Sequence, residues 1–216
     1  MRIPFSWAWY NFNKHLGSFP SKRNMITVDI FDSIAGEGLD IGHDGTYEFN
    51  SDSITRLNIY AGKNIDVVCD GETYPFENET FDKIMLRCIL EHVKKPLNIL
   101  KECNRILKPN GKIVIEVPFV NPIHAAPDDY LRFTPNGLIE LVKSINLDVE
   151  DIFYVQDYNW AIRWIMWHKL KNTSKRGFNY FFKMFLLKYL INPLLFKLKT
   201  PSENDFSSFG IVITKK

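Results

Sequence analysis

Apolar runs rich in valine and isoleucine alternate along this chain with segments of helical periodicity, and this alternation constrains the fold more than any other feature. Short runs rich in valine and isoleucine fit strands that are covered on both faces. They occupy residues 38–42, 54–60, 65–69, 81–86, 111–117, 149–155 and 209–214. Strands separated by helices predict an α/β fold with a doubly wound, mostly parallel, seven-stranded sheet. Such a sheet binds its ligand at the carboxyl ends of its central strands.

Two helices of this pattern are marked by proline. Pro96 opens the first, at a position where its missing N–H costs little, and the turn sequence Pro109-Asn-Gly111 ends it. Thr134 precedes Pro135 as the capping residue of the second helix. That helix carries an apolar stripe at helical spacing, made of Leu138, Leu141, Val142 and Ile145. Both helices are therefore expected to cover the sheet.

The composition suits one globular domain. Of the 216 residues, 45% are hydrophobic and 24% are charged, which excludes an intrinsically disordered chain and a disulfide-stapled miniprotein. We treat 1–216 as a single domain that begins with an N-terminal arm, 1–35. The cysteines Cys69, Cys88 and Cys103 are scattered, without a C-x-x-C pair or a histidine at zinc spacing. We expect reduced thiols, no metal site and, without a visible signal peptide, a cytoplasmic location.

A glycine turn follows the first strand, in the sequence Leu39-Asp-Ile-Gly-His-Asp-Gly45. Glycine there lets the backbone approach a ligand, although such turns are common. Further motifs follow in order: Asp70, Tyr74-Pro-Phe76, Phe81-Asp82, Leu90-Glu-His92 and Arg105-Ile-Leu-Lys-Pro-Asn-Gly111. As an ordered set they resemble the class I S-adenosylmethionine-dependent methyltransferases, whose motifs read L-D-x-G-x-G, D-x-x-x-x-P-F, F-D, L-E-H and R-x-L-K-P-G-G.

The resemblance implies a Rossmann-like methyltransferase fold with S-adenosylmethionine as its cofactor. Asp40 and Gly42 would line the methionine part, and Asp70 would meet the adenine amino group. Arg87 and Cys88, after the fourth strand, would lie beside the bound cofactor. The full implied set is Asp40, Gly42, His43, Gly45, Asn58, Asp70, Gly71, Arg87 and Cys88. Carboxylates at strand ends suit the ammonium, sulfonium and amino groups of this cofactor.

The cofactor turn departs from the family pattern. His43-Asp44 replaces the second glycine, and Gly45 comes one position late. Asn58 stands where the family has an acid that grips the ribose hydroxyls. The gap between Gly45 and the second strand is also short, which predicts a turn in place of the usual helix. These departures keep an alternative open, a degenerate and non-catalytic methyltransferase fold that acts as a binding or membrane-associated module.

Residues 118–134, after the fifth strand, are dense in groups that titrate and form hydrogen bonds. Their pattern P-F…H-x-x-P-x-D-Y-x-R-F-T resembles a methyltransferase subgroup associated with glycan and cell-envelope biosynthesis, which implies a sugar, a glycan or a related small molecule as acceptor. His124 is the natural general base for a hydroxyl, because the pKa of imidazole lies near neutrality. Asp128 or Asp129 could orient that imidazole or take the proton. The opposing interpretation is that these side chains, with Tyr130 and Arg132, only brace the loop.

Residues 159–201 form a basic aromatic insertion before the last strand. Trp160, Trp164 and Trp167 are spaced along one helical face, and nine Lys and Arg without an Asp or Glu lie between residues 158 and 201. This composition is typical of a helix in an anionic membrane interface, so we expect peripheral contact with the inner face of a membrane. The alternative is a helical hairpin that covers the core or a dimer face. No nucleic acid is expected as partner, and the oligomeric state is left open.

Overall fold

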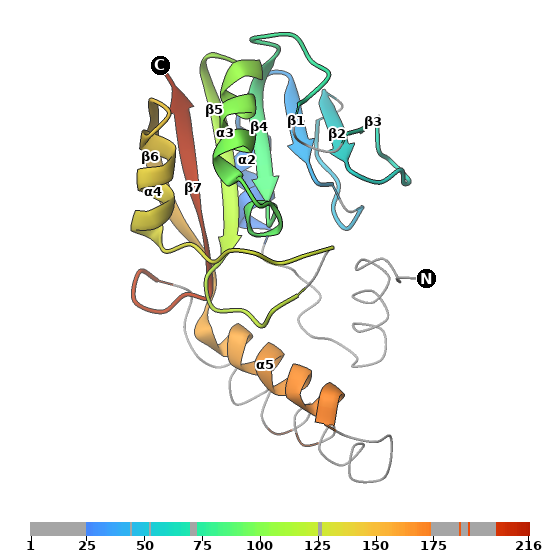
Figure 1. The fold of residues 1–216 in the computed structure, drawn as a ribbon, viewed down its shortest axis with the longest axis vertical. Coiled ribbons are helices and arrows are strands. Elements are labelled where there is room, and N and C mark those ends of the chain that lie inside the picture. Colours follow the sequence, from blue (N-terminus) through green and yellow to red (C-terminus); the bar gives the residue numbers. More distant parts are fainter. Residues whose placement is uncertain are drawn as a thin grey trace.

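The structure, shown in Figure 1, is a computed structural model that describes residues 25–216 with gaps. The gaps are residues 44, 52, 70–72, 125–126, 174–185, 187–189 and 191–201, and the side chains of 167, 168 and 170–173 are not described either. Most of the arm 1–35, the predicted cofactor residues Asp70 and Gly71, and most of the basic aromatic insertion therefore lie outside the described residues.

The described chain builds a seven-stranded sheet with the order β3-β2-β1-β4-β5-β7-β6. The strands are β1 (Gly38–Ile41), β2 (Ile54–Asn58), β3 (Val67–Val68), β4 (Phe81–Arg87), β5 (Leu107–Pro118), β6 (Leu147–Gln156) and β7 (Ser208–Lys215). The first five pair in parallel, and β7 runs antiparallel to β5 and β6. The predicted fold class is thus confirmed. The strand order reverses between β1 and β4, and the carboxyl ends of these two strands flank the point at which such sheets bind ligands.

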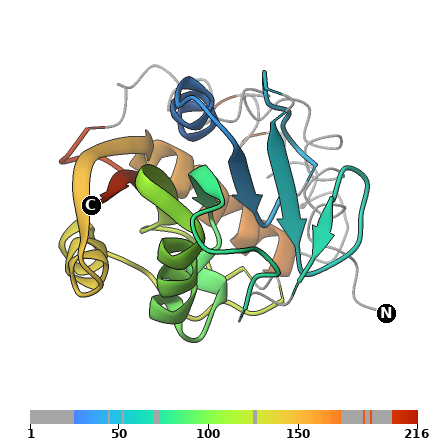
Figure 2. The same ribbon diagram turned by 90° about the horizontal axis from the view of Figure 1, so that it is seen from above.

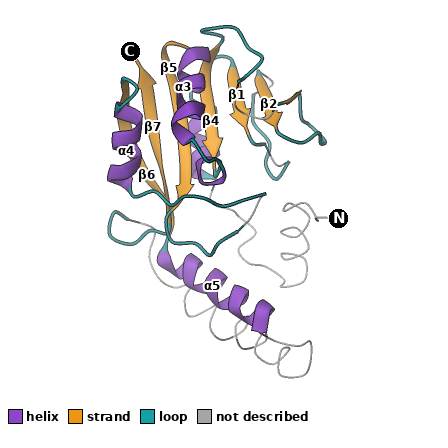
Figure 3. Cartoon of the chain, viewed as in Figure 1, coloured by secondary structure: helices purple, strands orange, loops and turns teal. Residues whose placement is uncertain are grey.

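Helices cover both faces of the sheet. Figures 1 and 2 show α2 (Ile26–Ser33) on one face and α3 (Pro96–Ile106) with α4 (Pro135–Lys143) on the other. The Thr134 hydroxyl caps α4 by accepting a hydrogen bond from the Gly137 N–H at 3.1 Å, as predicted. Beyond the carboxyl ends of β1 and β4 lies α5 (Tyr158–Thr173), with the loop between β5 and α4 between it and the sheet (Figure 3). In the part of the chain that the structure describes, no helix combines the length and apolarity needed to cross a membrane.

Strands β4 and β5 lie at the centre of the core. Their side chains alternate between the two faces of the sheet and so contribute to the clusters on both sides. Ile84 of β4 and Ile113 of β5 lie in the cluster beneath α3 and α4. Met85 and Val114, one position further along each strand, pack instead with Phe31 of α2. All five side chains are fully buried. The same alternation sends polar side chains near the carboxyl ends of these strands to the α2 face, where the site begins.

Two predicted boundaries differ from the structure. β5 begins at Leu107 rather than Gly111, because Leu107 takes extended backbone, is fully buried and pairs with Phe81. The register between β4 and β5 then shifts before Lys112. The third strand is reduced to two residues, Val67–Val68, beside the end of β2. Between Gly45 and Ile54 the described residues form turns and no helix, as the short gap predicted.

Candidate functional site

The predicted cofactor turn joins β1 to the segment before β2, at the edge of the sheet that faces α5 in Figure 1. Gly42 has a φ of 85° and Gly45 a φ of 72°, values that favour glycine at both positions. A Cβ added at Gly42 would lie 2.0 Å from the Cδ1 of Ile89, so the turn packs closely against the chain that follows β4. A Cβ at Gly45 would meet nothing within 4 Å, which leaves this part of the turn open to a ligand.

Asp40 and His43 form a fully buried pair beneath this turn. The Nδ1 of His43 lies 2.8 Å from the Oδ2 of Asp40, and the hydroxyl of Tyr47 donates to the same oxygen at 2.9 Å. The His43 ring also packs edge-on against Tyr47, with ring centroids 4.9 Å apart. Both side chains therefore point into the protein on the α2 side of the sheet, and the imidazole supports the turn from below.

Asn58, at the end of β2, holds the turn from the other side. Its Nδ2 donates to the carbonyl oxygen of His43 at 2.7 Å, and its Oδ1 accepts from the backbone N–H of Tyr60 at 3.1 Å. Next to it Ile59 and Tyr60 are exposed, at 42% and 62%. An open glycine turn, an amide and an exposed apolar surface fit an adenosyl cofactor with its methionine, ribose and adenine parts.

Arg87 and Cys88 end β4 beside this turn. The Arg87 Nε donates to the Oε2 of Glu116 at 2.9 Å, and the Thr27 hydroxyl donates to the same oxygen at 2.6 Å. The Arg87 guanidinium also lies over the ring of Tyr47, 5.1 Å from its centroid. Arg87 thus belongs to a buried polar network that ties α2, β4, β5 and the cofactor turn together. Cys88 has a φ of 55° and donates its backbone N–H to the carbonyl oxygen of Glu116 at 2.8 Å.

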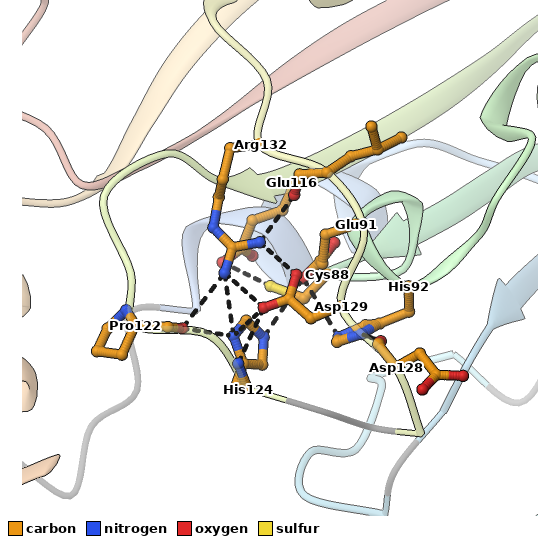
Figure 4. Close-up of polar contacts among 10 residues, drawn as sticks. Cys88, Glu91, His92, Glu116, Pro122, His124, Asp128, Asp129 and Arg132 are labelled. Carbon is orange, nitrogen blue, oxygen red and sulfur yellow. Dashed lines mark hydrogen bonds and ion pairs between the residues drawn. The ribbon is translucent and has the colours of Figure 1, made fainter.

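The loop between β5 and α4 is organised by an ion pair between Arg132 and Asp129, drawn in Figure 4. Both guanidinium nitrogens of Arg132 donate to the carboxylate of Asp129, and the His124 backbone N–H donates to its Oδ2 at 2.9 Å. Burial raises the pKa of Asp129, but these hydrogen bonds outweigh it and the net pKa is lowered. Asp129 is therefore held ionised as a brace. The carboxylate of Asp128 accepts from the Tyr130 hydroxyl at 3.0 Å.

Glu91, His92 and His124 meet beside this ion pair (Figure 4). Glu91 is fully buried in the short 3-10 helix η1 (Leu90–His92), and among the described residues neither of its carboxyl oxygens has a hydrogen-bond partner. Its Oε1 lies 3.6 Å from the Nε2 of His92 and 3.9 Å from the Nε2 of His124. Burial raises the pKa of Glu91 to about 8 and lowers the pKa of both imidazoles.

Both imidazoles are oriented by backbone carbonyl groups. The Nδ1 of His92 donates to the carbonyl oxygen of Asp128 at 2.6 Å, and the Nδ1 of His124 donates to that of Pro122 at 3.1 Å. Each Nε2 therefore presents a lone pair on the side of Glu91. The sequence analysis singled out His124 and included Glu91 and His92 only as members of the motif Leu90-Glu-His92, without a role at the site. The signal for Glu91 was an acid directly after the apolar residues Ile89 and Leu90, where a carboxylate is at risk of burial without a partner, which is costly.

Two cavities are lined by residues of the loop that carries His124. One, of about 370 Å³, is lined by Phe119, Val120, Asn121, Pro122 and the α5 residue Ile165. The other, of about 250 Å³, is lined by Asn121, Ile123 and residues 129–132. Trp164 of α5 is 6% exposed and stacks on the His124 ring at a centroid distance of 5.4 Å. The first described helix of the basic aromatic insertion thus forms one wall of the site.

A comparison with family models matches residues 46–115 to the family described as a methyltransferase domain. The matched segment is about a third of the chain. The match covers β2, β3, β4 and most of β5, and so includes the strand ends that carry Asn58, Arg87 and Cys88. S-adenosylmethionine is the cofactor of the class I methyltransferases that the motifs resemble.

Known proteins are similar to this chain over part of its sequence or in fold. A demethylmenaquinone methyltransferase of Clavibacter sepedonicus is 33% identical over 81 residues, which cover 36% of this chain and 33% of that protein. The chain thus spans less than half the length of the curated relatives it matches. A solved SAM-dependent methyltransferase of Thermotoga maritima shares the fold, with a TM-score of 0.60 and 15% identity over 97% of this chain and 96% of that chain. A Burkholderia thailandensis N1-methyltransferase solved with S-adenosylhomocysteine has a TM-score of 0.58 and 13% identity, over 100% of this chain and 92% of that one.

Proposed function

We propose that this protein is an S-adenosylmethionine-dependent methyltransferase that methylates a hydroxyl group of a sugar, a glycan or a related small molecule. The observation that supports it most directly is the position of the Glu91–His92–His124 cluster. Three proton-binding groups gather at the carboxyl ends of β4 and β5, next to the strand ends of a methyltransferase domain. The hydroxyl acceptor is supported by the motif of residues 118–134 and by the polar cavity that Asn121, Asp129 and Arg132 line.

The residues at the cofactor end would position the cofactor and take no part in proton or methyl transfer. Gly42 and Gly45 would let the backbone approach the methionine part, and Asn58 would face the ribose with its neighbours Ile59 and Tyr60 at the adenine. Asp40 and His43 act through the turn, because their side chains are buried beneath it. The bound cofactor supplies an electrophilic methyl group on a sulfonium. Methyl transfer is an in-line displacement, so holding the acceptor oxygen opposite that methyl group is the main task of the protein.

The acceptor end removes the proton. The His124 Nδ1 donates to the Pro122 carbonyl oxygen, so the Nε2 is the ring nitrogen without a proton in the neutral imidazole. His124 takes the hydroxyl proton as general base, and the lowered pKa of its imidazole keeps it neutral at pH 7. Asp129 orients His124 through the backbone N–H and is itself fixed by Arg132. Asp128 contributes its carbonyl group to His92 rather than a catalytic carboxylate.

A second candidate acceptor is the ring carbon of a quinol. The relatives of Clavibacter sepedonicus and Lactococcus lactis are named demethylmenaquinone methyltransferases, and each is at least 32% identical over its matched region. The cavity lined by Phe119, Val120 and Ile165 offers apolar walls to such a ring. Because the matched regions cover only 36% and 41% of this chain, a hydroxyl acceptor remains our first choice.

An anionic membrane is the surface we propose for the basic aromatic insertion. In its described part, Ile162 of α5 is 43% exposed and Ile165 is 45% exposed at the mouth of the first cavity, while Trp164 turns inward to the site. A helix with apolar side chains on the outside and one wall in the active site would bring a lipid-linked acceptor to His124. Flotation of the protein with liposomes of anionic lipid at low salt tests this proposal, and protein that stays at the bottom of the gradient contradicts it.

Calorimetry with S-adenosylmethionine and S-adenosylhomocysteine tests the function itself. We expect both compounds to bind to the wild-type protein. Gly42→Val should abolish this binding, because the new side chain would collide with Ile89 and disturb the turn. His124→Ala should retain it. In an assay of S-adenosylhomocysteine formation with sugar, glycan and quinol acceptors, His124→Ala should lower turnover by about 10²–10⁴-fold. Absence of heat at millimolar cofactor would show that the alternative, a non-catalytic binding module, is correct. Turnover by quinols alone would replace the hydroxyl acceptor with the second candidate.

A further inference from the structure

We propose that Glu91, His92 and His124 form a binding site for a divalent first-row transition metal, of which zinc is the best match. The three side chains each offer one ligand atom, and these atoms all lie within 4.8 Å of one another. Two imidazoles and one carboxylate, with a position left for water or substrate, are a known ligand set of catalytic zinc sites. The sequence predicted no metal site, because the two histidines come from elements far apart in the chain.

The distances suit such an ion. Zinc binds nitrogen and oxygen at about 2.0–2.1 Å, which places neighbouring ligand atoms of a tetrahedral site about 3.4 Å apart. The Glu91 Oε1 lies 3.6 Å from the Nε2 of His92 and 3.9 Å from the Nε2 of His124. These separations are too long for hydrogen bonds and only slightly wider than those between ligands of one ion. Small side-chain movements would therefore close the site.

The surroundings of the histidines are those of metal ligands. A histidine that binds a metal donates its other ring N–H to a carbonyl or carboxylate group, which fixes the tautomer. His92 does this with the Asp128 carbonyl oxygen at 2.6 Å, and His124 does it with the Pro122 carbonyl oxygen at 3.1 Å. Both Nε2 atoms are thus left with lone pairs on the side of Glu91.

The carboxyl group of Glu91 is an independent observation that points to a ligand. It is fully buried, and the described residues provide no hydrogen bond to either oxygen. Buried polar groups are nearly always hydrogen-bonded, because an unpaired one costs free energy. The guanidinium of Arg132 is not the missing partner, since it is bonded to Asp129 and the carbonyl oxygens of Leu131 and Pro122. A metal ion would satisfy Glu91.

The role of the ion in catalysis rests on the proposed function, whereas its binding does not. A hydroxyl acceptor in the open position would lose its proton more easily, because a bound cation lowers the pKa of the coordinated oxygen. The proton goes to solvent, and the acceptor oxygen forms a bond to the methyl carbon. The bond between that carbon and sulfur breaks, and its electron pair stays on sulfur, which yields the methyl ether and S-adenosylhomocysteine. Without the ion, His124 takes the proton directly.

The test is metal binding by the whole protein, measured apart from methyl transfer. Chelator-treated protein is titrated with Zn²⁺ by calorimetry and with Co²⁺ by visible absorption, whose intensity reports a tetrahedral site. We expect one equivalent of each to bind. Loss of hydrogen bonds around metal ligands already costs about 10–100-fold in affinity, so Glu91→Gln and His124→Gln should each weaken binding by about 100-fold or more. Asp128→Asn is the matched control, because among the described residues its carboxylate is hydrogen-bonded by Tyr130 alone and its backbone carbonyl still holds His92.

Thermal unfolding with and without Zn²⁺ shows whether a variant that fails to bind the metal is still folded. The ion should raise the melting temperature of the wild type and of Asp128→Asn but not of folded Glu91→Gln. Equal Zn²⁺ binding by all variants, or no binding by the wild type, overturns the proposal. Methyl transfer by metal-free, non-binding protein would leave the proposed function intact and remove the metal site. Metal binding without any methyl transfer would support the metal site and contradict the proposed function.

Discussion

Two buried carboxylate–imidazole groups lie at the carboxyl edge of this sheet, and they differ in how completely they are bonded. Under the cofactor turn, Asp40 accepts hydrogen bonds from His43 and Tyr47. At the acceptor end, Glu91 faces two imidazoles at distances too long for hydrogen bonds. Both carboxylate oxygens of Asp40 are bonded, which fixes its conformation, whereas the unbonded carboxyl group of Glu91 marks a place where a ligand or a proton is missing. The group of Asp40 thus has a structural role, and the group of Glu91 is suited to bind a ligand or a proton.

The largest effect that this comparison predicts is at the buried ion pair of Arg87 and Glu116, which contacts the Asp40 group through the ring of Tyr47. Glu116→Ala leaves the Arg87 guanidinium buried without its carboxylate and should lower the free energy of unfolding by about 3–5 kcal/mol. Urea unfolding measures it. The control is Glu150→Ala, since the pair of Glu150 with Lys112 is largely exposed and contributes about 0–1 kcal/mol. Equal losses in both variants would contradict a structural role for the buried network.

Asp40→Ala gives the next largest effect. It removes the acceptor of the hydrogen bonds from His43 and Tyr47 and leaves both donors buried, so unfolding should become easier by about 2–4 kcal/mol. The same urea titration measures the change, and calorimetry then reports whether the folded variant still binds S-adenosylmethionine. A variant with wild-type stability and no cofactor binding would mean that Asp40 contacts the cofactor, as the family resemblance implied, rather than supporting the turn.

The sequence predicted the parts of this molecule that depend on local order. Gly42 after β1 and Thr134 before α4 were identified because a turn and a cap each need particular residue types at one position. The start of β5 was predicted wrongly at Gly111, since the pairing of Leu107 with Phe81 is decided by the neighbouring strand. The role of Glu91 at the site was missed for a related reason. Its buried, unbonded carboxyl group lies beside His92, His124 and Arg132 only because the fold brings η1 and the loop between β5 and α4 together.

Glu91→Gln tests the unsatisfied region directly. In metal-free protein the pKa of Glu91 is raised by burial to about 8, so the native state keeps a proton that the unfolded chain loses above its usual pKa of 4.5. Wild-type stability should therefore fall as the pH rises from about 4.5 to 8, by at most about 1.4 kcal/mol per pH unit. Glutamine has no proton to lose, and the variant should not show this part of the slope. If the urea midpoints of the two proteins change with pH in the same way across that range, Glu91 does not titrate with a raised pKa, and the contrast with Asp40 fails.

The smallest effect compares two tyrosine hydroxyls. Tyr47→Phe removes the hydrogen bond to Asp40 from a side chain that is 7% exposed, and should lower the free energy of unfolding by about 1 kcal/mol. Tyr130→Phe removes an equivalent bond to Asp128, but that side chain is 42% exposed and water replaces the lost partner, so no change in the urea midpoint is expected. Both variants keep their aromatic ring, and any difference between them reports burial of the hydroxyl rather than packing. A larger loss at Tyr130 would mean that the acceptor loop, and not the cofactor turn, is the more tightly bonded region.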